Sequence, residues 1–150
     1  MGWWDYGIMG GDEPWDVAGD VTDLLKLDNF EDMHLPHYWT PDDQIMVKEA
    51  LLAYGGPKKL CDQIIKNWKG NSSHIIDQVV ALLTISAGCP IDEEFRKYAI
   101  AACDDEIQAL DQEVERIEKL NELKQLLISY QGQPISISQT SLFEKMFGGE

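Results

Sequence analysis

The feature that most constrains this fold is a run of apolar residues at three-and-four spacing between Asp92 and Leu127. Such spacing places the apolar side chains in one stripe along an α-helix. With Asp92 as the N-cap, the pattern predicts a single helix of roughly forty residues. The members of the stripe are Phe95, Ala99, Ala102, Cys103, Ile107, Leu110, Val114, Ile117, Leu120, Leu123 and Leu127.

The later half of this run, residues 111–127, carries Glu and Lys around a narrower apolar seam. A helix of this kind commonly leaves a globule to meet a partner helix or a second copy. We expect another helix to bury Leu120, Leu123 and Leu127, most simply in a homodimer. The alternative is that the seam folds back on the protein's own first helix.

Four shorter helical patterns precede this run, at residues 12–26, 40–55, 57–70 and 73–87. The stretch "IIDQVVALLTISA" is apolar almost all round and predicts a central, buried helix. Residues 28–39 show no clear period and are expected to form an irregular segment packed on the core. The sequence therefore predicts an all-α domain of about five helices, one of them long and C-terminal, over residues 1–130. A flexible tail is expected over residues 131–150.

The charge balance excludes several classes of function. The chain has 27 acidic and 12 basic side chains, a net charge of −15. Proteins that bind a phosphate backbone neutralise it with Lys and Arg, so nucleic acid is not expected as a direct ligand. No apolar run is long enough to cross a bilayer and no signal peptide pattern is present, so we expect a cytoplasmic protein. The odd number of cysteines, Cys61, Cys89 and Cys103, fits reduced core thiols.

Acidic residues gather near the N-terminus. Residues 1–33 hold nine acidic side chains against Lys26 alone, a net charge of −8. A solvated helix face that keeps the protein soluble is the simplest interpretation. Alternatively, carboxylates at helical spacing imitate a row of phosphates and occupy the basic groove of a DNA-binding enzyme, as DNA-mimic inhibitors do. The candidate acidic face comprises Asp5, Asp12, Glu13, Asp16, Asp20 and Asp23.

Candidates for metal binding and catalysis are few. His34 and His37 lie three residues apart and precede Asp42 and Asp43, so a metal site could be drawn with His74 or an N-terminal acid. The spacing matches no named zinc motif, and histidines in an aromatic segment more often pack. The cysteines fall on apolar faces, and no G-x-S-x-G elbow or phosphate-binding glycine pattern occurs. We expect a non-enzymatic protein with no metal and no cofactor. A small enzyme or metal-binding protein that uses His34 and His37 is the alternative.

The opening sequence "MGWWDYGIMGGDEPWDVAGDV" resembles the start of an uncharacterised bacterial family, domain-of-unknown-function family 4259. Sequences of that family begin with a pattern similar to Met-Gly-x-Trp. A Gly and a Phe-Asp-Asn-Asp-like stretch follow, and an Ala or Trp-Asp pair then opens a helix. The stretches "VVALLTISAGCPI" and "KYAIAACDDEI" look like its later Ala-rich helices, whereas residues 9–11 depart from its Phe-Asp-Asn pattern. The resemblance implies a helical fold and no particular activity. The matching residues are Met1, Gly2, Trp4, Gly7, Asp12, Trp15 and Asp16.

The C-terminal sequence places an apolar motif beyond a segment, residues 131–141, with the composition of a linker. The pentapeptide "QTSLF" resembles the motif by which bacterial replication and repair proteins bind the β sliding clamp, with Gln first and Leu-Phe last. Thr140 stands where that motif commonly has Leu. The alternative is a terminal amphipathic turn that packs on the body or on a partner subunit. The candidate partner-binding residues are Gln139, Ser141, Leu142, Phe143, Met146 and Phe147.

These patterns favour a non-enzymatic interaction or inhibitor protein, encoded by a phage or a mobile element, whose tail docks on the sliding clamp. A DNA-mimic inhibitor that acts through the acidic N-terminal face is the alternative. In either case the expected partners are proteins, with no direct contact to nucleic acid or membrane.

Overall fold

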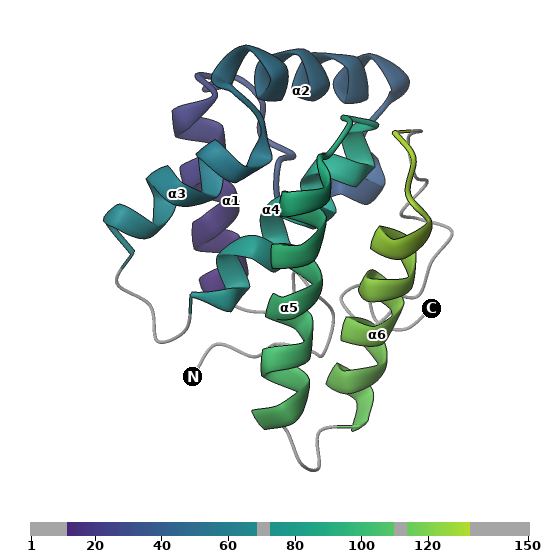
Figure 1. The fold of residues 1–150 in the computed structure, drawn as a ribbon. Helices are drawn as coiled ribbons and strands as arrows, with labels where there is room; N and C mark the ends of the chain where they lie inside the picture. Colours follow the sequence, from purple (N-terminus) through teal and green to yellow (C-terminus); the bar gives the residue numbers. More distant parts are fainter. Residues whose placement is uncertain (1–11, 69–72, 110–113, 133–150) are drawn as a thin grey trace.

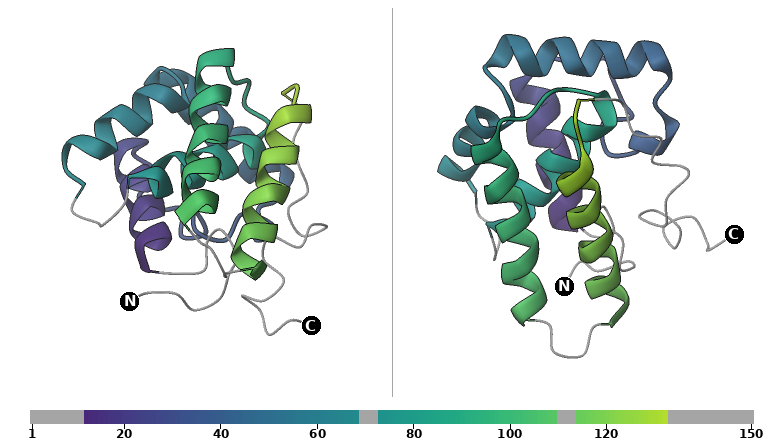
Figure 2. Two further views of the ribbon diagram at one scale, coloured as in Figure 1. Left: turned by 60° about the horizontal axis from the view of Figure 1, so that its bottom comes forward. Right: turned by 45° about the vertical axis from the view of Figure 1, so that its right-hand side comes forward.

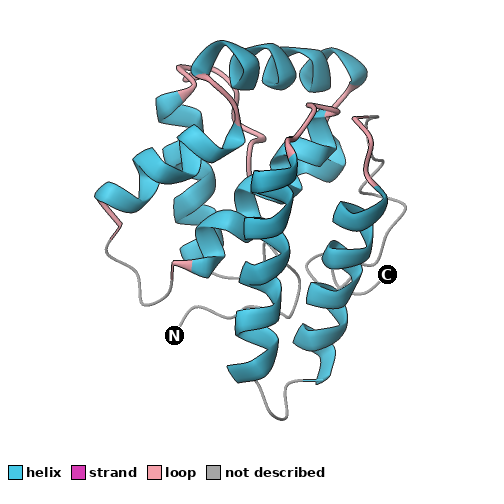
Figure 3. Ribbon diagram, viewed as in Figure 1, coloured by secondary structure: helices cyan, strands magenta, loops and turns pink. Residues whose placement is uncertain are grey.

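All the regular secondary structure of the described residues is helical. The computed structural model describes residues 12–68, 73–109 and 114–132, and these residues contain no strand (Figure 3). The all-α prediction is therefore confirmed. The elements are α1 (Asp12–Leu24), the short 3-10 helix η1 (Pro36–Tyr38), α2 (Pro41–Tyr54), α3 (Pro57–Lys66), α4 (His74–Ala87), α5 (Glu93–Ala109) and α6 (Val114–Ser129).

Helix α4 lies at the centre of the fold. It is buried at 12 of its 14 residues and packs against α1, α2, α3, α5 and α6 (Figure 1). An apolar sequence with no polar face has to be surrounded in this way, because any exposed side would place apolar surface in water. The prediction of a central helix over these residues is confirmed.

The ends of the helices follow the signals in the sequence. Thr40 and Asp43 form a capping box at the start of α2, in which the side chain of each accepts a hydrogen bond from the backbone N–H of the other. Gly55 ends that helix in the left-handed conformation, with φ of 114°. The Asp92 carboxylate accepts a hydrogen bond of 2.8 Å from the backbone N–H of Phe95 and so caps α5.

The remaining elements are arranged around α4 in two groups. Helices α1 and α3 lie on one side, α5 and α6 lie on the other, and α2 crosses one end of the assembly (Figures 1 and 2). The segment between α1 and α2 is irregular, as predicted, and places Met33 and Trp39 in the core. The Trp39 indole N–H donates to the backbone carbonyl of Asp32 at 2.7 Å, which fixes the end of this segment.

The segment that was expected to form one long helix forms two. Helices α5 and α6 lie side by side and run in opposite directions (Figures 1 and 2). Leu120, Leu123 and Leu127 are fully buried within the single chain, where α6 packs against α5 and α4. The seam is therefore buried by other helices, as expected. These helices are α5 and α4 of the same chain, and neither a second copy nor α1 is needed to cover it. Because α6 packs back against α5, the seam is buried in the core. In a single chain, one continuous helix would leave the seam exposed to water.

Candidate functional site

Helix α1 presents a row of carboxylates to solvent. Asp16, Asp20 and Asp23 are all exposed, and their spacing of four and three residues places them on one face of the helix. The opposite face, which includes Val17 and Val21, is buried in the core. Packing of the apolar face therefore fixes the direction in which the acidic row points. We refer to Asp16, Asp20 and Asp23 as the acidic row.

The three carboxylates of the acidic row interact electrostatically. The pKa of Asp20 is raised above its ordinary value, first by partial burial and then by the negative charges of Asp23 and Asp16. Within the described residues, no ion pair neutralises this row. A row of like charges held by a helix in this way would bind a basic surface favourably, because each carboxylate is stabilised by a positive neighbour.

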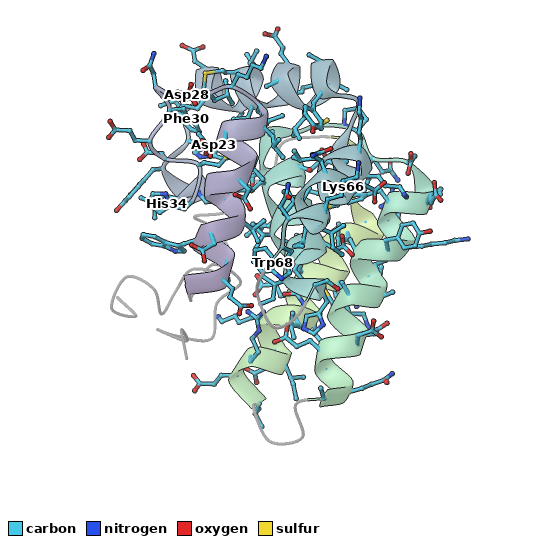
Figure 4. The ribbon with its side chains drawn as sticks, turned by 90° about the vertical axis from the view of Figure 1, so that its left-hand side faces the viewer. Asp23, Asp28, Phe30, His34, Lys66 and Trp68 are labelled. Atoms are coloured by element: carbon cyan, nitrogen blue, oxygen red, sulfur yellow. The ribbon has the colours of Figure 1, made fainter. Side chains whose placement is uncertain are left out.

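The irregular segment after α1 packs beside the helix. The rings of Trp15 and His34 lie 4.1 Å apart between centroids, and those of Phe30 and Trp39 lie 5.9 Å apart. Figure 4 shows Asp23 and His34 on the same side of the molecule. Partial burial lowers the pKa of His34, and the nearby Asp32 opposes that shift. His34 therefore has a packing role that needs no ligand.

The structure does not bring together, among the described residues, the candidate ligands of the alternative metal site. The His34 ring is in tilted contact with the Trp15 ring, and Asp43 forms part of the capping box of α2. His74 lies at the start of α4, 3.6 Å from a carboxylate oxygen of Glu106. Among the described residues, no group of three or more His, Cys, Asp or Glu side chains could hold a metal ion. The side chain of His37 lies outside the described structure.

A second group of charged residues is buried between α4, α5 and α6. The Arg116 guanidinium donates to both carboxylate oxygens of Glu106, at 2.8 and 3.0 Å. It also donates to the Gln78 side-chain oxygen at 2.9 Å, and the Gln78 amide donates to Glu106 at 2.8 Å and to the carbonyl of Ala102 at 3.3 Å. The exposed fractions of Gln78, Glu106 and Arg116 are 0%, 4% and 1%. We call these three residues the buried polar cluster.

The buried polar cluster is satisfied internally. Burial alone would raise the pKa of Glu106, but the hydrogen bonds and positive charge of Arg116, with help from Gln78 and His74, bring it below its ordinary value. A buried ion pair is stable only when its hydrogen bonds are completed in this manner. The cluster therefore joins three helices and leaves Glu106 ionised, which is a structural role.

Sequence reasoning missed the buried polar cluster. The predicted apolar stripe of residues 95–127 includes neither Glu106 nor Arg116. A charged side chain is seldom buried without a partner, and here the partner is ten residues away. The one available signal was position: Glu106 and Arg116 fall on the stripe that also holds Ala102 and Leu120. A charged residue on an apolar stripe can indicate an internal pair.

The three cysteines lie in the core as free thiols, as predicted. Burial raises the pKa of each, most clearly for Cys61, whose neighbour Asp77 adds to the shift, while that of Cys103 reaches about 12. The pKa of Cys89 is also raised by burial. Because the thiolate is the nucleophilic form, these side chains are poorly suited to nucleophilic catalysis.

Several predicted site residues lie outside the described residues. These are Asp5, the side chain of Asp12, and the whole of the C-terminal motif, including Gln139, Ser141, Leu142, Phe143, Met146 and Phe147. Glu13, which belongs to the candidate acidic face, is partly exposed in the first turn of α1. In the part of the chain that the structure describes, no helix is long and apolar enough to cross a membrane. Comparison of the chain with protein-family models, curated proteins and solved structures gave no match.

Proposed function

We propose that this chain is a non-enzymatic interaction protein that binds a basic surface of a partner protein through the acidic row of α1. The observation that carries the proposal is the exposed row Asp16, Asp20 and Asp23, which makes no ion pair within the described residues. This row lies on a helix whose other face is anchored in the core. A rigid scaffold of this kind holds the charges in register before binding, so little ordering cost opposes association.

The spacing of the acidic row suits a partner that normally binds phosphates. An α-helix rises 1.5 Å per residue, so the row spans roughly 10 Å along the helix axis. Phosphates along a DNA strand repeat at about 3.4 Å of helix rise, so the row covers the length of about three of them. Together with the net charge of −15, this spacing favours a DNA-mimic mode in which the row occupies the basic groove of a DNA-binding enzyme.

The experiment compares two variants that carry the same change of net charge. The first is Asp16→Asn, Asp20→Asn and Asp23→Asn together. The control neutralises three exposed acids elsewhere, in Glu49→Gln, Asp105→Asn and Glu118→Gln together. Binding would be measured against a panel of bacterial DNA-binding enzymes, with duplex DNA as a competitor.

The proposal expects three results from this comparison. DNA should displace the protein, added salt should weaken binding, and only the acidic-row variant should lose it. Binding that is independent of salt, or that both variants lose equally, would reject the acidic row as the interface.

We further propose that the C-terminal motif docks on the bacterial β sliding clamp. The support is the sequence "QTSLF", in which a glutamine amide can hydrogen-bond in a small polar niche while Leu142 and Phe143 fill an apolar pocket. Replacing Gln139, Leu142 and Phe143 with alanine should abolish binding to purified clamp, with roughly 2 kcal/mol or more lost from the two apolar anchors. Failure of a peptide spanning residues 135–150 to bind clamp at high micromolar concentration would reject this second mode.

A further inference from the structure

Helix α2 carries apolar side chains on two sides. Val47 and Leu51 are fully buried, where the helix packs on α4 and α3. Ile45 and Leu52 are 54% and 53% exposed, and their spacing of seven residues places them on one side of the helix, two turns apart. We call Ile45 and Leu52 the outer face of α2. A surface helix normally turns polar side chains to water, so a second apolar side favours a contact surface.

Among the elements that the structure describes, none covers the outer face. Helix α2 crosses one end of the fold, and its main contacts are with α4 and α3 on its inner side (Figures 1 and 2). A second copy is a poor occupant, because each copy carries a net charge of −15 and the two would repel. A segment of the same chain avoids most of the entropic cost of association, since it is held close by its connection.

The described chain ends beside the start of α2. The Gln44 side-chain amide donates to the backbone carbonyl of Ser86 at 2.8 Å, and the Tyr130 hydroxyl donates to that of Cys89 at 2.7 Å. Both acceptors belong to the C-terminal end of α4, so Tyr130 is tied to the same region as the residue that precedes Ile45. Helix α1 begins at the end of the fold away from α2 (Figure 1). The C-terminal residues are therefore better placed than the N-terminal ones to reach the outer face.

The chain beyond this point is long enough to cover α2. Ten residues separate Gly132 from Leu142, and an extended chain spans at most about 3.3–3.6 Å per residue, or roughly 33 Å in all. Helix α2 has 14 residues and so is about 21 Å long. Residues 139–147 can therefore reach either turn of the outer face.

The chemistry of residues 139–147 suits an apolar helix face. Their one Glu and one Lys give no net charge, so the acidic body does not repel them as it would a second copy. Four large apolar residues occupy positions that fall on one side of a two-turn helix. Such a side is the kind of surface that packs against another apolar helix face. These residues are Leu142, Phe143, Met146 and Phe147.

We propose that residues 139–147 dock as a short helix on the outer face of α2 of the same chain and cover Ile45 and Leu52. The contact requires neither the acidic row nor an external partner. Leu142 and Phe143 are also the anchors of the proposed clamp contact, so the docked segment would withhold them from the clamp. Only this last consequence rests on the proposed function, and the contact itself is tested without the clamp.

Trypsin cleavage after Lys145 reports whether the segment is docked. Lys145 is the one Lys or Arg among residues 133–150, and cleavage requires the segment to leave α2, so its rate follows the undocked population. Replacing Ile45→Ser and Leu52→Ser together in the full chain should speed this cleavage roughly tenfold or more. The matched control, Ile65→Ser with Ile128→Ser, removes two exposed isoleucines elsewhere and should leave the rate unchanged. Mass spectrometry over time measures the loss of residues 146–150.

Three outcomes of the cleavage experiment would overturn the proposal. One is an equal rate in the native chain and both variants, and another is an equal acceleration by both variants. The third is protection that increases with protein concentration, which would place the segment on α2 of a second copy.

Methyl NMR of the full chain provides a second test. Aromatic rings shift the resonances of neighbouring methyl groups, so Phe143→Leu with Phe147→Leu should move the methyl signals of Ile45 and Leu52. The signal of Ile65, an exposed residue on α3, should not move. Leucine keeps the segment apolar, so the variant removes the rings without removing its hydrophobic character. Unchanged Ile45 and Leu52 signals would contradict docking on the outer face.

Discussion

The acidic row of α1 and the buried polar cluster handle charge in opposite ways. In the row, Asp16, Asp20 and Asp23 face water, and the pKa of Asp20 is raised by partial burial and by the charges of Asp23 and Asp16. In the cluster, Glu106 is buried with Arg116 and its pKa is lowered. The cluster has its positive partner inside the fold, whereas the row has none among the described residues. The buried carboxylate of Glu106 is neutralised by an ion pair within the fold and has a structural role. The exposed carboxylates of the acidic row have no such ion pair among the described residues and are available to bind a partner.

The largest effect is expected from removing the positive charge of the cluster. Arg116→Met leaves Glu106 buried without its ion pair and should lower the free energy of unfolding by about 3–5 kcal/mol in urea denaturation. The triple variant Gln78→Leu, Glu106→Leu and Arg116→Met removes the whole cluster and should recover most of that loss. If Arg116→Met costs less than about 1 kcal/mol, the cluster does not hold the three helices together.

The second prediction concerns acid. Because the folded pKa of Glu106 is lowered from 4.5, its contribution to stability is fully present above that value and is lost as pH falls through the lower folded pKa. Glu106→Gln should therefore make the free energy of unfolding fall less steeply below pH 4.5. Glu118→Gln, at an exposed position, serves as the matched control for the loss of one carboxylate. Equal slopes in the native protein and Glu106→Gln would contradict this assignment.

The smallest effect is expected in the acidic row. Here a substitution should raise the free energy of unfolding, whereas the substitutions in the buried polar cluster lower it. The folded pKa of Asp20 is raised, so its ionised form opposes folding at neutral pH, and this cost disappears as pH falls through the raised value. Asp20→Asn should raise the free energy of unfolding slightly, by less than about 0.5 kcal/mol, at low salt. The gain should shrink as salt is added. If Asp20→Asn lowers the free energy of unfolding while the control Asp105→Asn leaves it unchanged, Asp20 has a stabilising partner and the prediction is wrong.

Local signals made most of the fold predictable from sequence. Thr40, Gly55 and Asp92 marked helix ends that the structure shows, and the apolar run of residues 75–87 identified the central helix. The acidic row was also predictable, because side chains at helical spacing opposite a buried face have to share a side of the helix. The raised pKa of Asp20 was not predictable, because its largest cause is partial burial, which residue spacing does not report.

The antiparallel packing of α5 and α6 was not predictable from periodicity. A heptad pattern specifies which face of a helix is buried but not what buries it, and residues 93–129 contain no glycine or proline that would mark the end of a helix. The pairing of Glu106 with Arg116 depends on that packing, since the two side chains meet only when the helices lie side by side. Both features are decided by tertiary packing, which overrides local preference.

The most direct test of the difference between the two regions is a carboxyl-carbon NMR titration that follows Asp20 and Glu106 in the same sample. The pKa of Asp20 should lie above 3.8 and that of Glu106 below 4.5. Adding a lysine-rich peptide should then lower the pKa of Asp20 and leave that of Glu106 unchanged, because only the acidic row is open to an external positive charge. A pKa of Asp20 that is already low, or that does not respond to the peptide, would contradict the acidic row as a binding surface.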